Sequence, residues 1–278
     1  MKNFFPPSFD KLAILLKQVE QKKLKLNDKL SKFYPQVPHA NQITIGQLLT
    51  MEAGLQGKDE SSYGTPVFKN NQAGIKYDIK HNIVFNKKQY NQRFYSSSNY
   101  ILLSGILEKV THHSYESLVK ETYIKKLGLS ETEFYWDIPK NKRIKVAVPY
   151  TKNSQGYLVP HSVAVDKVHG NLGAGSLVMS NKDLYRATSA ILNGEIIKPS
   201  SIQTVYAPSA PAKYNAGFYN FPDFHSSNGS GDGYTTYYRI SNDTRDVLIV
   251  QSNYPVKDYF KVREICNDLM ENLIKSPS

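Results

Sequence analysis

The strongest constraint on the fold is a change of hydrophobic period along the chain. Segments between residues 12 and 192 repeat their apolar residues at helical spacing, whereas the pattern near the C-terminus is that of strands. There, the β-prone run Tyr234–Tyr238 is followed by the turn residues Asn242 and Asp243 and by the apolar run Val247–Val250, which predicts an antiparallel hairpin. Helices in the middle of the chain and strands near one end predict an α+β fold, with helices flanking an antiparallel sheet.

Two helices can be bounded from local signals. A short helix is expected through Leu48 and Leu49, with Gly54 as its C-terminal glycine. Ser180 and Asp183 have the spacing of a capping box, so a second helix is expected to begin there.

Two further segments bear on the architecture. The stretch from Gln56 to Gln92 is polar and has no strong period, which is typical of irregular loops. The segment Tyr259–Ile274 predicts a closing amphipathic helix with Val262, Ile265 and Leu269 facing inward and Cys266 as a further candidate for that face.

Size and charge restrict the class of protein and of partner. The 278 residues, 40% of them hydrophobic, can bury the core of one large domain or of two interleaved subdomains. The 35 Lys and Arg against 24 Asp and Glu give a net charge of +11, which favours anionic partners such as nucleic acid, acidic membrane or a polyanionic cell wall. No Lys/Arg run is long enough for a nucleic-acid-binding arm, so we expect a diffuse basic surface and no nucleic-acid partner.

Several other classes are excluded by single observations. Cys266 is the only cysteine, so the sequence allows neither an internal disulfide nor a cysteine metal cluster. The seven histidines lack metal-binding spacing, and we expect no metal and no other cofactor. No stretch approaches about eighteen apolar residues, and the first residues lack an apolar core, so neither a membrane span nor a signal peptide is expected in this chain.

Five ordered segments carry a resemblance to a known family. They are Leu24–Asp28, Ile43–Leu55, Phe94–Leu103, Gly173–Leu184, and Gly233–Tyr234 together with Val247–Asn253. In this order they resemble the exit from the nucleophile helix, the segment after it, the Tyr-x-Asn motif, the Gly-Gly-Leu segment and the closing hairpin of the serine β-lactamase and penicillin-binding-protein superfamily. That superfamily includes DD-peptidases and class C β-lactamases.

The resemblance implies a β-lactamase/transpeptidase-like fold. A single domain is expected over residues 1–278, with a helical and irregular lobe inserted at about 56–170. Compared with the family, the chain is expected to be N-terminally shortened and to lack the first strands of the sheet. Those strands would otherwise pair with the C-terminal hairpin.

The family's chemistry needs a serine nucleophile near the start of a helix and a lysine one turn later on the same face. Ser8 and Lys11 satisfy the Ser-x-x-Lys pattern. A gapless match of the apolar helix residues instead puts Phe5 at the nucleophile position and Ser8 at that of the lysine. Both alignments stay open at this point.

The remaining site residues are also carried over from the resemblance. Tyr95 corresponds to the tyrosine of Tyr-x-Asn, which implies a role as general base, and Ser97 stands in place of the asparagine. Ser227 and Gly229 stand where the family has Lys/His-x-Gly on the strand that lines the site. The resemblance implies catalytic roles for Ser8, Lys11 and Tyr95, and substrate binding by the other three.

Two functions follow from this resemblance. The first is a serine hydrolase that acts through an acyl-enzyme on D-alanyl amides or esters of the bacterial cell wall, as DD-carboxypeptidases and D-alanyl esterases do. The alternative is a catalytically degenerate homologue that serves as a cell-wall-binding module. The implied partners are peptidoglycan or teichoic acid fragments and, by extension, β-lactams, and the implied location is extracellular or at the cell surface.

Overall fold

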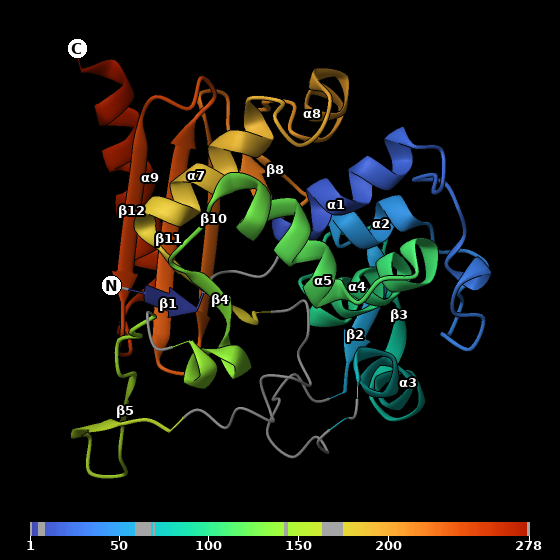
Figure 1. The fold of residues 1–278 in the computed structure, drawn as a ribbon, viewed down its shortest axis with the longest axis horizontal. Helices are drawn as coiled ribbons and strands as arrows, with labels where there is room; N and C mark the ends of the chain where they lie inside the picture. Colours follow the sequence, from blue (N-terminus) through green and yellow to red (C-terminus); the bar gives the residue numbers. More distant parts are fainter. Residues whose placement is uncertain are drawn as a thin grey trace. The chain divides into compact units, whose positions relative to one another are not determined.

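The chain divides into a helical unit and a sheet unit. The computed structural model describes residues 2–4, 9–58, 68, 70–141, 144–162 and 175–276. The sheet unit comprises Met1–Pro6, Tyr123–Val163 and Leu177–Ser278, and the helical unit comprises Pro7–Thr122 and Ala164–Ser176 (Figure 1). The helical unit therefore begins ahead of the 56–170 lobe that the sequence suggested.

The helical unit is built around α4. Its described elements, from blue to green in Figure 1, are α1 (Phe9–Glu20), η1 (Leu30–Lys32), α2 (Ile45–Thr50), β2 (Ala53–Gly57), α3 (Asn71–His81), β3 (Ile83–Tyr90), α4 (Ser97–Thr111) and α5 (Tyr115–Val119). The π-helix η2 (Lys120–Lys125) follows α5 along the chain.

The ends of α2 show one correction to the sequence analysis. A capping box begins the helix, because the Gln47 amide donates to Thr44 Oγ1 and the Thr44 amide donates to Gln47 Oε1. The left-handed residue that ends α2 is Met51, with φ 59°, and not Gly54. Gly54 lies within β2 instead, where it also has positive φ. A non-glycine residue in this conformation carries no signal that sequence inspection could use.

The polar stretch from Gln56 to Gln92 holds more regular structure than its composition suggests. Its described part contains the helix α3 and the strand β3. Asn70 caps α3 by accepting a hydrogen bond from the Ala73 amide, and β3 pairs antiparallel with β2. The expectation of irregular loops was wrong here, because packing against α4 stabilises a segment whose own helical period is weak.

Close packing against α4 depends on Gly105. This residue lies in the middle of α4, where its missing side chain leaves room for Tyr34 and for Ile75 of α3. The Tyr34 hydroxyl donates to Gln72 Oε1, and Gln72 Nε2 in turn donates to the Gly105 carbonyl and to Glu108. Glycine is therefore required by close approach in the interior of this helix.

The sheet unit is arranged around a five-stranded antiparallel sheet in the order β12-β11-β10-β9-β8, beside a three-stranded sheet β1-β7-β4. Its described strands are β1 (Lys2–Phe4), β4 (Thr132–Phe134), β5 (Tyr150–Lys152), β6 (Leu158–Pro160), β7 (Leu177–Ser180), β8 (Lys213–Asn215), β9 (Phe218–Asn220), β10 (Phe224–Gly231), β11 (Tyr234–Ser241) and β12 (Val247–Ser252). Its described helices are η3 (Tyr135–Lys140), α7 (Asn181–Leu192), α8 (Pro199–Val205) and α9 (Tyr259–Lys275).

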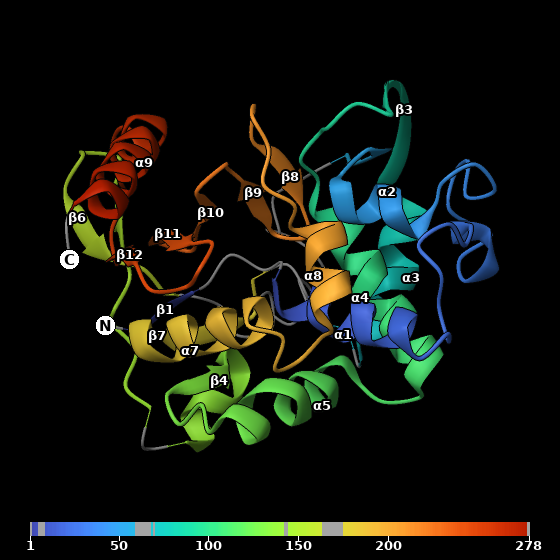
Figure 2. The same cartoon turned by 90° about the horizontal axis from the view of Figure 1, so that it is seen from above.

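Successive residues of β11 face different layers, as the side-chain alternation of a strand requires. The Tyr237 hydroxyl donates to the Tyr259 carbonyl of α9, whereas the Tyr238 hydroxyl is hydrogen-bonded to Thr188 of α7. The two helices therefore cover opposite faces of the sheet, and Figure 2 shows α9 above it and α7 below it. The predicted α+β arrangement and the predicted hairpin, now β11 and β12, are confirmed.

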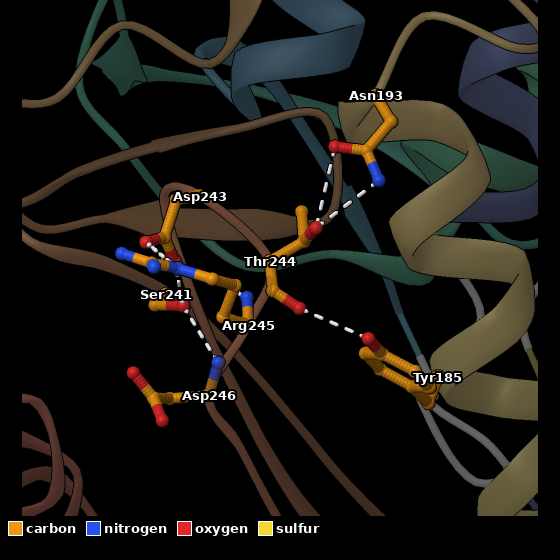
Figure 3. Close-up of polar contacts among 7 residues, drawn as sticks. All are labelled: Tyr185, Asn193, Ser241, Asp243, Thr244, Arg245 and Asp246. Carbon is orange, nitrogen blue, oxygen red and sulfur yellow. Dashed lines mark hydrogen bonds and ion pairs between the residues drawn. The ribbon is translucent and has the colours of Figure 1, made fainter. Parts of the chain in front are cut away.

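The tip of this hairpin is fixed to α7 (Figure 3). Thr244, with φ 61°, exchanges hydrogen bonds with the Asn193 side chain, and its carbonyl accepts from the Tyr185 hydroxyl. Within the tip, Asp243 accepts hydrogen bonds from Ser241 and Arg245, which lower the pKa of its carboxyl to about 2. These contacts hold a β-branched residue in a backbone conformation that it seldom adopts.

The helices α7 and α9 lie where the sequence predicted them, but not all of their predicted contacts are present. Ser180 accepts from the Asp183 amide at the start of α7, as expected, whereas Asp183 itself accepts from the Glu131 amide and from Thr132. In α9 the predicted inward positions of Ile265 and Leu269 are wrong. Both side chains are exposed, and the buried positions are Cys266 and Met270.

Helix length and hydropathy also bear on the membrane question. Among the described residues, no helix is both long and apolar enough to cross a bilayer.

His225 is the buried imidazole of the sheet unit. It lies on β10 against the rings of Tyr206 and Phe218, and its Nδ1 is 2.8 Å from Asn220 Oδ1. Burial lowers the pKa of His225 to about 4, because no water is available to solvate the imidazolium.

We predict that Gly105→Ala destabilises the protein although alanine is the better helix former. The added methyl would overlap Tyr34 and Ile75, and overpacking of this kind costs about 1–3 kcal/mol, against roughly 1 kcal/mol of gained helix propensity. Urea unfolding measures the difference. In the control Gly231→Ala the new methyl meets no atom within 4 Å, and we expect a change within about 0.5 kcal/mol. Equal stability of the two variants would contradict this packing account.

We predict that the free energy of unfolding falls as the pH is lowered from about 6.5 to about 4. The unfolded chain binds a proton at His225 below its ordinary pKa of 6.5, whereas the folded chain resists protonation down to about 4, so acid favours unfolding by up to about 3 kcal/mol. His225→Gln should flatten this part of the stability profile. The exposed His113→Gln should not, and a wild-type slope retained in His225→Gln would refute the assignment.

Candidate active site

Three of the predicted site residues lie in the helical unit, two of them at the start of α4. Tyr95 lies just before this helix with half of its side chain exposed, and Ser97 is its first residue. The loop that carries them is held by a hydrogen bond from the Phe94 amide to the Met51 carbonyl. A tyrosine at the entrance of a helix, with its ring reaching solvent, is accessible to a substrate.

Lys11 approaches α4 from α1. Its side chain is 1% exposed, and its ammonium lies 5.1 Å from the centroid of the Tyr100 ring and 5.7 Å from that of Tyr115. Both distances are within the range of cation–π attraction, which stabilises a cation that burial removes from water. Tyr100 is the fourth residue of α4, so Lys11 contacts the helix that Ser97 begins.

The predicted nucleophile cannot be placed in this geometry. Ser8, like the alternative Phe5, lies outside the described residues, and α1 is described from Phe9 onward. Lys11 is therefore two residues into the helix that the Ser-x-x-Lys pattern predicted.

Among the described residues, two buried polar atoms at the start of α4 have no hydrogen-bond partner. They are the hydroxyl oxygen of Ser96, which is the N-cap residue, and the side-chain oxygen of Asn99. The amide nitrogen of Asn99 donates to the Ser96 carbonyl and fixes the orientation of that side chain. A buried polar atom that stays unsatisfied costs about 1–3 kcal/mol, so this turn of α4 favours a polar group that could pair with the two atoms.

The sheet unit carries the other two predicted residues on β10. The strand is paired along its whole length with β11, but β9 pairs only with His225 and Ser226. From Ser227 to Gly231 the second edge of β10 thus has no strand neighbour in the described chain. Ser227 is buried and Gly229 half-buried, and their main-chain groups form an edge along which an extended ligand could add as a further strand.

The open part of β10 is braced by Arg239, a residue that the sequence analysis did not single out. The guanidinium is fully buried and donates to Asn228 Oδ1 at 2.8 Å, to the Ser227 carbonyl at 3.4 Å and to the Tyr238 carbonyl at 2.8 Å. It also donates to Asn267 Oδ1 at 2.6 Å and to the Arg263 carbonyl at 2.9 Å, both on α9. Burial lowers the pKa of Arg239 to about 10. In the sequence, the one sign of its importance was that Arg239 is a single charged residue within a run of β-prone residues.

Metal binding receives no support from the described residues. Within the described ranges, no group of three or more His, Cys, Asp or Glu side chains is placed to hold an ion.

Comparison with known proteins gives one family and several relatives. Residues 12–265 match the Beta-lactamase family. The chain is 26% identical over 265 residues to a putative penicillin-binding protein, PbpX, of Bacillus subtilis, covering 94% of this chain and 64% of the relative. It is 28% identical over 270 residues to a teichoic acid D-alanine hydrolase of Staphylococcus aureus, covering 93% and 63%. The chain thus spans less than two thirds of the length of these curated relatives.

Solved structures with similar folds come from several sources. FmtA of Staphylococcus aureus superposes with a TM-score of 0.78 at 24% identity, covering 96% of this chain and 75% of FmtA. A D-amino acid amidase of Ochrobactrum anthropi gives 0.75 at 16% identity, covering 98% and 84%. At these identities the likeness concerns the fold, which is the β-lactamase-like fold expected from the sequence. The family match extends over most of the chain, and the chain therefore belongs to the beta-lactamase family.

Proposed function

We propose that this chain is a penicillin-binding-protein-like serine hydrolase that forms an acyl-enzyme with D-alanyl amides or esters of the bacterial cell wall. The observation that carries the proposal is that Tyr95 and Ser97 stand at the start of α4, a helix whose Tyr100 ring has the Lys11 ammonium 5.1 Å from its centroid. The unsatisfied Ser96 and Asn99 atoms beside them support a ligand site there. The relatives named for teichoic acid D-alanine hydrolysis and for penicillin binding support the substrate class.

In the proposed reaction, Ser8 Oγ attacks the carbonyl carbon of the D-alanyl group. Lys11 and Tyr95 take the serine proton and deliver it to the leaving oxygen or nitrogen, so that the leaving group departs as a neutral alcohol or amine. The D-alanyl group, alone or at the end of its peptide, stays on Ser8 as an ester. Water then attacks this ester, one proton of the water goes to Ser8 Oγ, and D-alanine or the peptide is released as the carboxylic acid.

The proposed substrate contacts use the remaining predicted residues. Ser97 offers one hydroxyl to the substrate where the family has an asparagine, and the free edge of β10 at Ser227–Gly229 offers main-chain donors and acceptors. The net charge of +11 favours an anionic polymer such as teichoic acid. An extracellular or surface location, with peptidoglycan or teichoic acid as partner, follows from the same proposal.

A second candidate is a binding module that holds the same polymer without hydrolysing it. The observation that favours it is Ser227, which is buried and brings neither a cation nor an imidazole to the strand edge. A substrate carboxylate would lack the usual electrostatic partner there.

We predict that a fluorescent penicillin or fluorophosphonate probe labels the protein, and that Ser8→Ala abolishes the label because the attacking oxygen is gone. In-gel fluorescence, with mass spectrometry of the labelled peptide, gives the result. Ser200→Ala is the matched control, since Ser200 is an exposed serine on α8. Label retained on Ser8→Ala would refute the nucleophile, and the absence of label combined with binding of teichoic acid would favour the binding module.

We predict that Tyr95→Phe slows acylation by the probe about 10²–10⁴-fold, the usual contribution of a positioned acid–base group. The fold should be unaffected, because half of the Tyr95 side chain faces solvent. The rate constants are measured by quenching the labelling reaction at successive times and quantifying the labelled protein. Tyr157→Phe, at an exposed tyrosine of the sheet unit, serves as control, and equal rates for Tyr95→Phe and the wild type would remove Tyr95 from the mechanism.

A further inference from the structure

Basic side chains are concentrated in the segment of the helical unit that follows α1, in the blue stretch between α1 and α2 in Figure 1. Residues 22–32 contain five lysines and one acidic residue, so this segment carries a net charge of +4, out of +11 for the whole chain. The side chains of all five lysines are exposed; they are Lys22, Lys23, Lys25, Lys29 and Lys32. A surface with one sign of charge attracts ligands of the opposite sign and raises their local concentration.

The backbone that carries these lysines is fixed to the segment around α2. The Gly46 amide donates to the Leu26 carbonyl at 2.8 Å, and the Leu30 amide donates to the Ile43 carbonyl at 2.8 Å. The side chains of Leu24 and Leu30 are buried and anchor the segment to the core. The lysines therefore project from a backbone that is already ordered, so ligand binding does not have to order it.

The one acidic residue of the segment joins two of its lysines. The Lys25 amide and the Lys32 ammonium both donate to Asp28 Oδ2, at 2.9 Å and 3.2 Å. This contact brings together two lysines that are seven residues apart in the sequence. A single carboxylate can neutralise only one cation, so the segment keeps its positive excess.

A sixth lysine is added by α4. The exposed Lys109 donates to the Phe33 carbonyl at 2.7 Å, and its ammonium lies 4.0 Å from the centroid of the Tyr34 ring. The Lys32 ammonium lies 5.4 Å from the centroid of the Phe33 ring, so Lys32 and Lys109 contact the same residue. The neighbouring Glu108 is engaged by hydrogen bonds from α3 and α5. Lys109 and the five lysines of residues 22–32 are called the lysine surface below.

The composition of the lysine surface indicates which kind of polyanion fits it. It contains no arginine, whose planar guanidinium holds one phosphate through paired hydrogen bonds, whereas lysine acts as a point charge. Within the described residues 9–58, no large hydrophobic side chain is exposed. Nucleic-acid bases would therefore have no stacking surface there, and a bilayer would receive no apolar anchor. Phosphates spaced along a flexible polar chain need neither.

We propose that the lysine surface binds the phosphate groups of a polyanionic cell-wall polymer such as teichoic acid, at a place separate from the candidate active site. The choice of this polymer rests on the proposed function. Ser97 and Lys109 both belong to α4, and at 1.5 Å per residue the helix separates them by about 18 Å. A polymer with many repeating units is long enough to contact both ends of the helix.

The charge of the polymer decides which stretches the lysine surface prefers. A D-alanyl ester carries a protonated amino group at neutral pH, which offsets the charge of one phosphate. Stretches without D-alanine are more negative and should bind more tightly. The lysine surface would thus hold the part of the polymer from which the proposed reaction has already removed D-alanine.

Binding of a fluorescent poly(glycerol phosphate) free of D-alanine tests the proposal, because this polymer lacks the group on which the active site would act. Fluorescence anisotropy with the full chain gives the affinity between about 50 and 300 mM salt. We expect the affinity to fall as salt rises, because bound phosphates release their counterions. A quadruple glutamine variant should bind about tenfold more weakly at the lowest salt and show a shallower salt dependence. Its substitutions are Lys22→Gln, Lys23→Gln, Lys25→Gln and Lys32→Gln.

Two matched variants separate the lysine surface from net charge. Arginine at the same four positions keeps the charges and should keep the affinity within about threefold. The second variant removes four exposed lysine charges from the sheet unit and should also bind within about threefold of the wild type. Its substitutions are Lys152→Gln, Lys182→Gln, Lys257→Gln and Lys261→Gln. Equal weakening of the two glutamine variants, or no binding by the wild type at the lowest salt, would overturn the proposal.

Further ligands and the penicillin probe distinguish the remaining outcomes. Tighter binding of oligodeoxythymidylate or of phosphatidylglycerol vesicles than of the polymer would overturn the choice of partner. The quadruple glutamine variant should react with the penicillin probe at the wild-type rate, because its substitutions lie outside the candidate active site. Polymer binding without probe labelling would support the lysine surface and contradict the proposed hydrolase. Labelling without polymer binding would do the reverse.

Discussion

The sheet unit depends on one buried cation. Arg239 lies between β10, β11 and α9 and donates its hydrogen bonds to carbonyl and carboxamide oxygens of all three elements. None of these acceptors is a carboxylate, so the charge is stabilised by dipoles that the fold has already oriented. Such an arrangement is expensive to break, because loss of the guanidinium would leave several buried acceptors without donors. It fixes the position of β10, the strand that carries Ser227 and Gly229.

The same residue explains how β10 stays in place where it has lost a neighbour. Beyond Ser226 the strand has β11 on one edge only, and an isolated edge would be free to twist or fray. Through its bonds to Asn228 and to Asn267, Arg239 connects the strand to α9. In the described part of the chain, this contact holds β10 where a second strand neighbour is absent.

Much of this architecture could be predicted from the sequence, because the signals were local. Ser180 caps α7 as its spacing with Asp183 suggested, and the β11–β12 hairpin follows its turn residues. The failures share one cause. The helical period of α9 indicated which residues form its apolar face, but it could not indicate that Ile265 and Leu269 have no covering partner in the described chain. Likewise, the contacts of α3 with α4 are not readable from the polar sequence of α3.

The candidate site was predictable only in part, and for a similar reason. The order of the segments matches the order of the family's motifs, and this match predicted Lys11, Tyr95 and the β10 residues as site residues. The roles of Tyr100 and Tyr115 around Lys11 and of Arg239 behind Ser227 arise from contacts between segments far apart in sequence. No spacing rule connects such residues.

The unpaired edge of β10 also determines which substitutions the protein can tolerate there. A ligand that adds along an edge is held by main-chain N–H and C=O groups, which every residue except proline supplies in equal measure. The side chain at Ser227 can therefore change without loss of these main-chain hydrogen bonds. A protein of this design would lose its preference for charged ligands before it loses its affinity for an extended peptide. It would therefore still bind such a ligand after it had ceased to hydrolyse it.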